Sequence, residues 1–262
     1  MNALLVASRS AEPAKGGWSP IGRLQFEAGT YRFVYTRGAR TAHGFTPFSG
    51  MEDLEAVYES DKMFPVFANR MLPESRPEYE AYLRWSGFDP ANPPDPIAIL
   101  GVTEGIRRTD MIELFPCPVP DERGCYLNKF FLHGLRYMPE VAKARVLALR
   151  QDEPLFPMLD VCNQADPNAV ALRAESERVM LGYVPRYLAH DFWKLFQNCQ
   201  PDFINVFVHR VNHDAPLQQR LLCRIHACWP DGFQPCAGQE FQPIPQGVPA
   251  HCGPSPGEPR GS

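Results

Sequence analysis

The stretch from about Arg123 to Pro230 constrains the fold most, because short apolar segments alternate there with turn residues around one amphipathic helix. Strand-type runs are expected at residues 128–137, 144–149, 168–172, 178–183, 204–211 and 220–228. Pro185 introduces the helix, on which five side chains share one face: Leu188, Phe192, Leu195, Phe196 and Cys199. Several short strands with one flanking helix predict a compact β-barrel of the OB or SH3-like kind.

The first 120 residues have a different pattern, in which strand and helix signals alternate. A first strand is expected within residues 1–10, and a hairpin over residues 21–35 turns at Gly29. Apolar residues then recur at helical spacing within 64–72 and 79–83, a short helix is expected at 97–100, and 111–115 is a last strand. The run from Cys117 to Pro120 is typical of a linker. The sequence therefore predicts an α+β chain, with a small mixed domain at 1–120 and a barrel at 123–230.

The C-terminal residues, 231–262, are rich in Pro, Gly and Gln and have no periodic apolar face. A segment of that composition cannot bury enough apolar surface to offset its loss of conformational entropy. A mostly extended or disordered tail is expected.

Charge and composition limit the partners of the chain. Its 262 residues carry a net charge of −4, whereas proteins that coat duplex DNA are usually strongly basic. Any contact with nucleic acid must therefore be local and involve few residues. The sequence has no apolar run near the length of a membrane span, so no membrane partner is expected.

The eight cysteines are irregularly spaced, and several stand inside apolar runs. That usage is typical of buried free thiols in a reducing cytoplasm, so we expect a cytoplasmic location. A structural zinc site is conceivable around Cys223, His226 and Cys228. It is disfavoured because Cys223 and Cys228 would face opposite sides of a strand, and no cofactor is expected.

No motif of a catalytic site is visible. The chain has no nucleophile elbow, and its histidines are scattered. His190 and Asp191 are adjacent on an expected helix, where neighbouring side chains diverge. The sequence therefore predicts a chain without catalytic activity.

Three segments of the barrel region resemble the HIRAN domain family in the right order. They are His133-Gly-Leu-Arg-Tyr137, Asn163-Gln-Ala-Asp-Pro-Asn-Ala-Val170 and Leu181-Gly-Tyr-Val-Pro-Arg186. HIRAN domains occur alone in bacteria and fused to DNA-remodelling helicases in eukaryotes, and the best understood examples hold the 3′-hydroxyl end of single-stranded DNA. The resemblance implies that this chain binds single-stranded DNA, with an OB-like barrel as its fold.

The resemblance also implies roles for five residues. Arg136 and Tyr137 match the strand that contacts the terminal nucleotide, Asp166 matches the acceptor of the 3′-hydroxyl, and Tyr183 and Arg186 match the loop that meets the backbone. The residue types suit these roles, because an aromatic ring stacks on any base and a guanidinium donates a fork of hydrogen bonds to phosphate. A carboxylate accepts from a hydroxyl and repels a terminal phosphate.

Two departures from the family pattern bear on end recognition. Ala165 stands where the end-binding relatives have an aromatic residue, so one stacking wall is either missing or supplied by another residue, for which Phe156 and Tyr187 are the candidates. The stretch 155–162 also has the form of an insertion. Both features favour an alternative hypothesis, in which the chain is a protein-interaction or regulatory adaptor with a degenerate groove.

The N-terminal part resembles the small N-terminal subdomain of HipA-type kinases. The features are Ile21-Gly-Arg-Leu24, the hairpin through Tyr35, and the segment 67–74 with its Met-Leu-Pro-Glu end. No kinase motif follows. The resemblance therefore implies a detached accessory domain that offers a surface to a protein partner and transfers no phosphoryl group.

Overall fold

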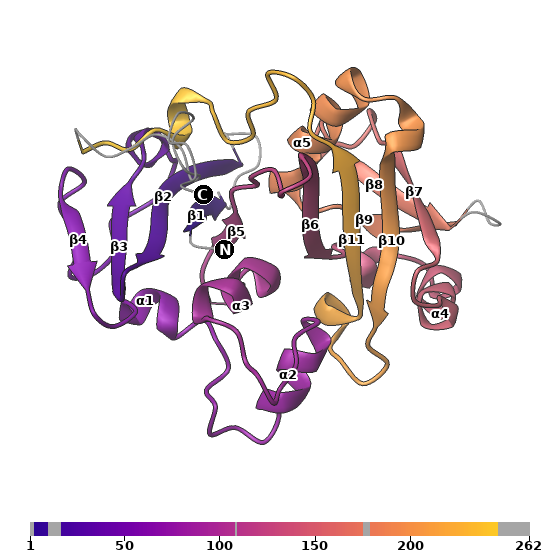
Figure 1. The fold of residues 1–262 in the computed structure, drawn as a ribbon, viewed down its shortest axis with the longest axis horizontal. Helices are drawn as coiled ribbons and strands as arrows, with labels where there is room; N and C mark the ends of the chain where they lie inside the picture. Colours follow the sequence, from indigo (N-terminus) through magenta and orange to yellow (C-terminus); the bar gives the residue numbers. More distant parts are fainter. Residues whose placement is uncertain (1–2, 10–16, 108, 175–178, 246–262) are drawn as a thin grey trace. The chain divides into compact units, whose positions relative to one another are not determined.

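The computed structural model describes residues 3–9, 17–107, 109–174 and 179–245. The chain forms two compact units, each assembled from segments far apart in the sequence (Figure 1). The first unit comprises Met1–Leu72, Asp95–Val119 and Gln234–Ser262, and the second comprises Pro73–Pro94 and Pro120–Phe233.

The first unit is built on a five-stranded antiparallel sheet of order β4-β3-β2-β1-β5. Its strands are β1 (Ala3–Arg9), β2 (Trp18–Glu27), β3 (Thr30–Tyr35), β4 (Val57–Ser60) and β5 (Ile112–Pro116). Its helices are α1 (Pro65–Ala68) and α3 (Pro96–Thr103). The side chain of Asp95 caps α3 by accepting from the backbone N–H of Ile97 at 2.7 Å. The expected first strand, the hairpin and the helix after Asp95 are confirmed.

The predicted boundary near residue 120 misses one segment: residues 73–94 precede it in the sequence but belong to the second unit. Helix α2 (Tyr79–Trp85) lies in this segment and is therefore part of the second unit. The indole N–H of Trp85 donates to Asp214 at 3.0 Å, and the Asn212 amide donates to the Trp85 carbonyl at 3.0 Å. Gly87 then packs so closely that a Cβ there would lie 2.9 Å from the His209 ring. These contacts are the physical reason for the grouping, and the sequence pattern gave no sign of them.

The tail prediction is wrong for residues 234–245, which return to the first unit. The Gln242 carbonyl accepts from the N–H of Arg37 at 2.8 Å, and the Ile244 N–H donates to the Tyr35 carbonyl at 2.9 Å. The ring of Phe241 also packs against Trp18, with 6.2 Å between centroids. Strand-like pairing to an existing edge can order a segment that has no apolar periodicity of its own. The rest of the expected tail, 246–262, lies outside the described residues.

The second unit contains a curled six-stranded sheet of order β6-β11-β10-β7-β8-β9, in which every neighbouring pair is antiparallel. Its strands are β6 (Cys125–Phe131), β7 (Pro154–Leu159), β8 (Val170–Ala174), β9 (Met180–Tyr183), β10 (Ile204–Val211) and β11 (Leu221–Cys228). The expected hairpin over 204–228 is confirmed as β10–β11. The expected turn at 175–177 lies outside the described residues. The predicted α+β class is confirmed, and the curled six-stranded sheet forms a half-barrel, consistent with an OB-like fold.

Two helices of this unit pack on the sheet. Helix α5 (Arg186–Asn198) buries Leu188, Phe192 and Leu195, and the ring of Phe192 meets that of Phe130 edge to face at 6.3 Å. Helix α4 (Glu140–Ala148) occupies the place of the strand predicted at 144–149, so that prediction is wrong. Within the described part of the chain, no helix is long and apolar enough to cross a membrane.

The burial pattern of α4 explains the error. Its fully buried residues, Ala142 and Val146, stand four apart, which is helical spacing. Leu147 lies inside the apolar run that favoured a strand, yet it is 39% exposed. The strand prediction considered residues 144–149 alone. It therefore left out the first turn of the helix, where the helical spacing of buried residues begins with Ala142.

The stretch 155–162, which has the form of an insertion in the family pattern, contains a strand of the sheet. Most of it forms β7, which pairs with β8 over five positions and with β10 over two. Leu155 faces the core and is 3% exposed. Residues 154–159 therefore belong to the middle of the sheet, and only 160–169 form a connecting loop.

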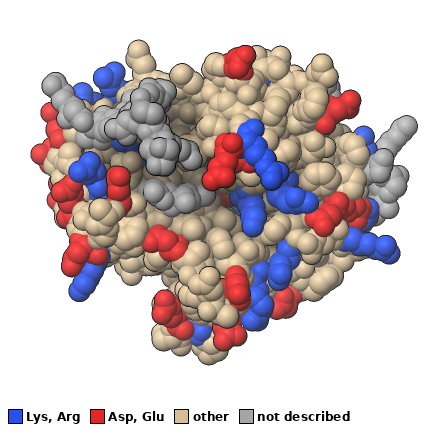
Figure 2. All heavy atoms as spheres, in the orientation of Figure 1, with Lys and Arg blue, Asp and Glu red and all other residues tan. Residues whose placement is uncertain are grey.

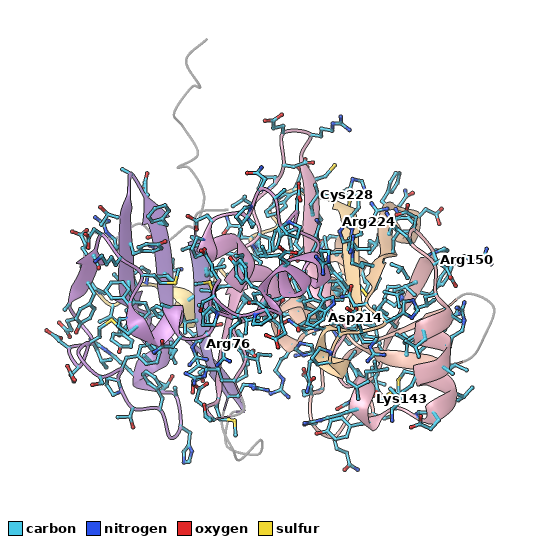
Figure 3. All side chains as sticks on the ribbon, turned by 90° about the horizontal axis from the view of Figure 1, so that it is seen from below. Arg76, Lys143, Arg150, Asp214, Arg224 and Cys228 are labelled. Carbon is cyan, nitrogen blue, oxygen red and sulfur yellow. A yellow bond between two sulfur atoms is a disulfide. The ribbon has the colours of Figure 1, made fainter. Side chains whose placement is uncertain are left out.

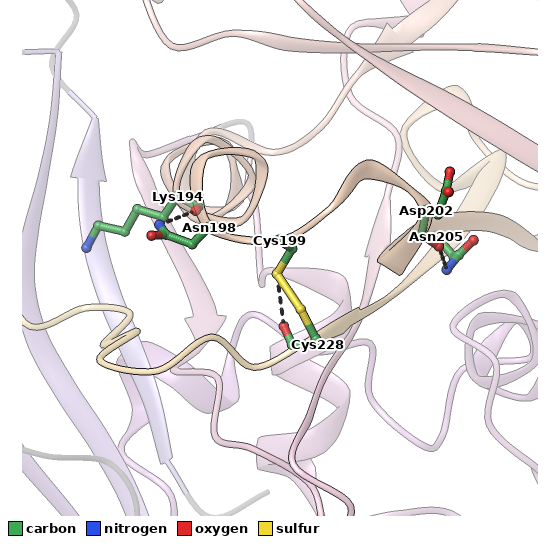
Figure 4. The surroundings of a disulfide bond; sticks show 6 residues. All are labelled: Lys194, Asn198, Cys199, Asp202, Asn205 and Cys228. Atoms are coloured by element: carbon green, nitrogen blue, oxygen red, sulfur yellow. Dashed lines mark hydrogen bonds between the residues drawn. A yellow bond between two sulfur atoms is a disulfide. The ribbon is translucent and has the colours of Figure 1, made fainter.

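One pair of cysteines departs from the expectation of free thiols. Cys199 follows α5 and Cys228 ends β11, and the two are joined in a disulfide with 6.8 Å between their Cα atoms (Figure 4). Cys125, Cys162 and Cys223 are free thiols. Cys223 is fully buried, and burial raises the pKa of its thiol above the ordinary range.

Candidate nucleic-acid interface

Backbone pairing brings two of the expected site segments together. The N–H of His133 donates to the Tyr183 carbonyl at 2.8 Å, and the Tyr183 N–H donates to the His133 carbonyl at 2.9 Å. A Cβ at Gly182 would lie 2.5 Å from the His133 carbonyl oxygen, so only glycine allows this close approach. The 3₁₀ turn at Leu135–Tyr137, which carries Arg136 and Tyr137, therefore starts beside the end of β9.

The third segment is the 160–169 loop, which is closed by two side-chain turns. The Asn163 side-chain oxygen accepts from the backbone N–H groups of Ala165 at 3.0 Å and Asp166 at 3.1 Å. Asp166 Oδ1 in turn accepts from the N–H of Asn168 at 3.0 Å. Such Asx turns hold a loop without regular secondary structure. The indole of Trp193 on α5 donates to the Asn168 carbonyl at 3.0 Å and fixes the end of the loop.

Arg186 and Asp166 form the central ion pair of the site. Arg186 Nε lies 3.0 Å from Asp166 Oδ2, and its Nη2 donates to the Ala165 carbonyl. The two side chains are 34% and 18% exposed, respectively. The guanidinium thus stands at the first turn of α5 with the 160–169 loop folded onto it, and solvent reaches both partners.

The Asp166 carboxylate keeps acceptor capacity after these contacts. A carboxylate has about four lone-pair directions, and the N–H of Asn168 and Arg186 Nε occupy two. The remaining two can accept a hydroxyl from outside. The site can therefore accept a hydroxyl hydrogen bond and present a guanidinium at the same point.

Tyr183 links the loop to the 3₁₀ turn. Its hydroxyl donates to Asp160 Oδ2 at 2.9 Å, and its ring lies over Gly134, where a Cβ would be 3.2 Å from ring carbon Cδ2. Gly134 has φ of +76°, a conformation that favours glycine. Burial, followed by the hydrogen bond to Asp160, raises the pKa of Tyr183, which keeps its hydroxyl protonated as a donor.

Arg136 and Tyr137 provide an exposed aromatic platform. Tyr137 is 72% exposed, the highest value among the exposed large apolar side chains of the described chain. The Arg136 guanidinium carbon lies 4.5 Å from the centroid of the Tyr137 ring, and Nη2 donates to the Tyr137 hydroxyl. A ring with one face free and a cation on the other suits stacking with a base.

The five predicted residues thus divide into two connected groups. Asp166 and Arg186 touch each other, and Tyr183 is tied to the same loop through Asp160. Arg136 and Tyr137 follow Gly134, which lies under the Tyr183 ring. The Tyr137 N–H donates to the Gly134 carbonyl at 2.9 Å, and the side chains of Arg136 and Tyr137 contact each other. The sequence reasoning missed Asp160 and Asn163, although Asn163 stands within the motif 163–170 and has the side chain that Asx turns require.

The replacement for the aromatic residue at position 165 can now be assessed. Tyr187 is 7% exposed, so its ring is covered by protein and offers no face to a ligand. Phe156 lies on β7 opposite Arg173, whose guanidinium carbon is 5.0 Å from the ring centroid. Of the two candidates, only Phe156 remains partly accessible.

The zinc site that the sequence analysis considered and disfavoured is not assembled among the residues that the structure describes. No three His, Cys, Asp or Glu side chains there come close enough to share a metal ion. Cys228 is bonded to Cys199, Cys223 is buried and His226 is exposed. His251 and Cys252, which follow this cluster in the sequence as further possible ligands, lie outside the described residues.

Comparison with known proteins finds a family match for part of the second unit. Residues 127–226 match the family model of the HIRAN domain. The HIRAN domain is a nucleic-acid-binding module and not a catalytic one, and all five predicted site residues lie in the matched range. The matched range excludes residues 1–120, so the HipA resemblance stays a prediction.

Two solved structures are similar to parts of the chain. A protein from Lactobacillus plantarum is 19% identical with a TM-score of 0.30, and the match covers 40% of this chain and 99% of that one. The HIRAN domain of human HLTF is 15% identical with a TM-score of 0.29, and the match covers 41% of this chain and 81% of that one. No curated protein matches the chain.

Proposed function

We propose that the HIRAN region of this chain holds single-stranded DNA at its 3′-hydroxyl end, without catalytic activity of its own. The observation that carries this proposal is the contact between Asp166 and Arg186, because it places a hydroxyl acceptor and a phosphate donor side by side. The terminal hydroxyl would bond to Asp166, and Arg186 would move part of its bonding to the adjoining phosphate. Tyr137 would stack on a base.

The alternative of an adaptor with a degenerate groove has less support from the geometry. That hypothesis expects the site residues to be dispersed, whereas Asp166, Tyr183 and Arg186 share one loop and its contacts. Ala165 still leaves one side of the terminal base without a ring from the loop. For the first unit, the proposal is that it offers a surface to a protein partner.

Fluorescence anisotropy with short oligonucleotides tests the proposal. The wild-type chain should bind a 3′-hydroxyl oligonucleotide about tenfold to a hundredfold more tightly than its 3′-phosphate form, since a hydrogen bond to a charged group contributes about 1.5–3 kcal/mol. Asp166→Asn keeps an acceptor for the Asn168 N–H and removes the charge, so it should abolish the discrimination. Equal affinity of the wild-type chain for both ends would refute end recognition, and no binding of either at low salt would refute nucleic-acid binding.

A further inference from the structure

One face of the second unit's sheet carries aromatic and basic side chains in register. Strand pairing sets Phe156 opposite Arg173, Phe207 opposite Arg224, and Arg224 opposite Lys129. The guanidinium carbon of Arg173 lies 5.0 Å from the Phe156 ring centroid, and that of Arg224 lies 5.0 Å from the Phe207 centroid. All five residues are partly exposed. The face thus holds two rings, each backed by a planar cation.

This face is continuous with the candidate site. Met158 pairs with Ala171, and Ala171 pairs with Tyr183, so these three side chains lie on one face. Phe156 stands two residues before Met158 on the same strand, and side chains two apart share a face. Phe156 and Tyr183 therefore lie on the same face of the sheet, and β7 leads directly into the 160–169 loop.

The charge of this face is unbalanced. Lys129 and Arg224 are cross-strand neighbours of like charge; burial and then Arg224 lower the pKa of Lys129. Arg224 bonds to Asp152 at 2.8 Å, but Lys129 has no acidic partner among the described residues. Burial and then Lys129, Arg224 and Arg210 also lower the pKa of His209, to about 4. Like charges opposite each other are destabilising, so an anion there would be stabilising.

Basic side chains are visible on the surface over this part of the sheet (Figure 2). Figure 2 shows Lys and Arg side chains gathered over β6 and β11. Figure 3 labels Arg224 on β11 and shows Arg76 well apart from it. A chain with net charge −4 that gathers cations beside aromatic rings offers a local site for a polyanion with planar groups.

We propose that this face, carrying Phe156, Arg173, Phe207, Arg224 and Lys129, binds the nucleotides that precede the terminal one on a single strand of DNA. The proposal deepens the proposed function and rests on it for the position of the terminal nucleotide. Bases stack on the guanidinium-backed rings, and Lys129 and Arg224 contact phosphates. From β9 to β6 the sheet has five strand spacings, roughly 24 Å in total, which fits the span of several nucleotides.

The dependence of affinity on oligonucleotide length tests this face. The wild-type chain should bind a 3′-hydroxyl strand of about twelve nucleotides at least tenfold more tightly than one of about three, in line with the site sizes of related barrels. The double variant Phe156→Leu, Phe207→Leu keeps apolar side chains under the arginines and removes both rings. It should reduce this length ratio about tenfold. An unchanged ratio in the double variant, with an unchanged melting temperature, would overturn the proposal.

A circular single strand separates this proposal from end recognition, because it has no end to hold. The wild-type chain should bind the circle weakly, and the double variant should lose that binding. If the wild-type chain ignores the 3′ terminus but binds the circle through the two rings, the proposed end recognition fails and this face stands. If the wild-type chain prefers the 3′-hydroxyl and the double variant binds the circle as tightly as wild type, this face fails alone.

The cations have a matched control. Arg224→Gln should lower the slope of log affinity against log salt by about 0.7, the contribution of one phosphate contact on a single strand. Arg76→Gln removes the same charge from an exposed position in the same unit and should leave the slope unchanged. Equal slopes for the two variants would overturn the phosphate contact. Binding of poly-glutamate in place of single-stranded DNA would overturn the choice of ligand.

Discussion

Asp191 should make the stability of the second unit depend on pH. It lies on α5 with 3% exposure, and the Tyr126 hydroxyl donates to its Oδ2 at 3.0 Å. Burial raises the pKa of this carboxyl from 3.8 to about 7, and the hydrogen bond from Tyr126 and the charge of Lys194 only partly oppose the effect. A pKa difference of one corresponds to about 1.4 kcal/mol. The pKa difference of Asp191 between the folded and unfolded states therefore corresponds to about 4 kcal/mol in the free energy of unfolding.

The sign follows from proton binding. Between about pH 4 and pH 7 the folded state holds the Asp191 proton and the unfolded state releases it, so stability falls as pH rises. The stability that the protonated Asp191 carboxyl contributes is fully present below about pH 4, and it is lost as the pH rises through about 7. Asp191→Asn stays neutral and its amide oxygen can still accept from Tyr126. Relative to wild type, the variant should gain up to about 4 kcal/mol at pH 8 and little at pH 4.

Urea unfolding of both proteins at about pH 5 and pH 8 measures the difference, and carbon NMR of the Asp191 carboxyl measures its pKa directly. Asp202→Asn is the control, because it makes the same change at an exposed position and should shift stability by less than about 0.5 kcal/mol at either pH. A variant that is equally destabilised at both pH values would show that the carboxyl is ionised in the folded state, and the reasoning would be wrong.

Three further substitutions test other parts of the structure. Gly134→Ala should cost about 1–2 kcal/mol, because φ is +76° and the new Cβ would press on the Tyr183 ring; thermal melting and oligonucleotide binding should both weaken. Asp110→Asn should cost about 2–4 kcal/mol of the first unit's stability, since Asp110 holds Arg70, whose side chain is 2% exposed, through two bonds of 2.7 and 3.0 Å; unfolding in urea measures it. Cys199→Ser should cost about 3–4 kcal/mol relative to the oxidised chain, the value for a loop of this length, and the loss should vanish when both proteins are compared in reductant.

The elements found from the sequence are those whose signals are local. The N-cap at Asp95, the turn at Gly29 and the amphipathic face of α5 each act within a few residues, and the corresponding helices and strands are present. Helix α4 was missed for the opposite reason, because its buried residues stand four apart while the apolar run beside them imitates a strand. A search of the sequence for apolar patterns treats one element at a time. It fails where residues at helical spacing overlap a short apolar run that is typical of a strand.

The contacts that the sequence did not predict join residues far apart in the chain. The return of residues 234–245 to β3 depends on backbone bonds, which carry no residue signature. The Cys199–Cys228 bond joins the end of a helix to the end of a strand across 29 positions, and spacing alone gives no pairing. The site residues themselves were named through the family resemblance, whereas the Asp166–Arg186 and Tyr183–Asp160 contacts required the fold.

Asp166 shows how a structural and a functional reading of one residue can both hold. As part of Asp166-Pro-Asn168 it is a turn residue, and Oδ1 does accept from the Asn168 N–H as that turn requires. Oδ2 accepts from Arg186 Nε at 3.0 Å, and the Asp166 side chain is 18% exposed. Under the proposed function, Oδ1 would hold the turn and Oδ2 would lie at the ligand. An asparagine at 166 keeps the turn through its single oxygen and removes the charge, whereas an alanine removes both. Loss of end discrimination in both variants, with loss of stability only in the alanine, would therefore assign the turn to Oδ1 and the recognition of the hydroxyl to the charge.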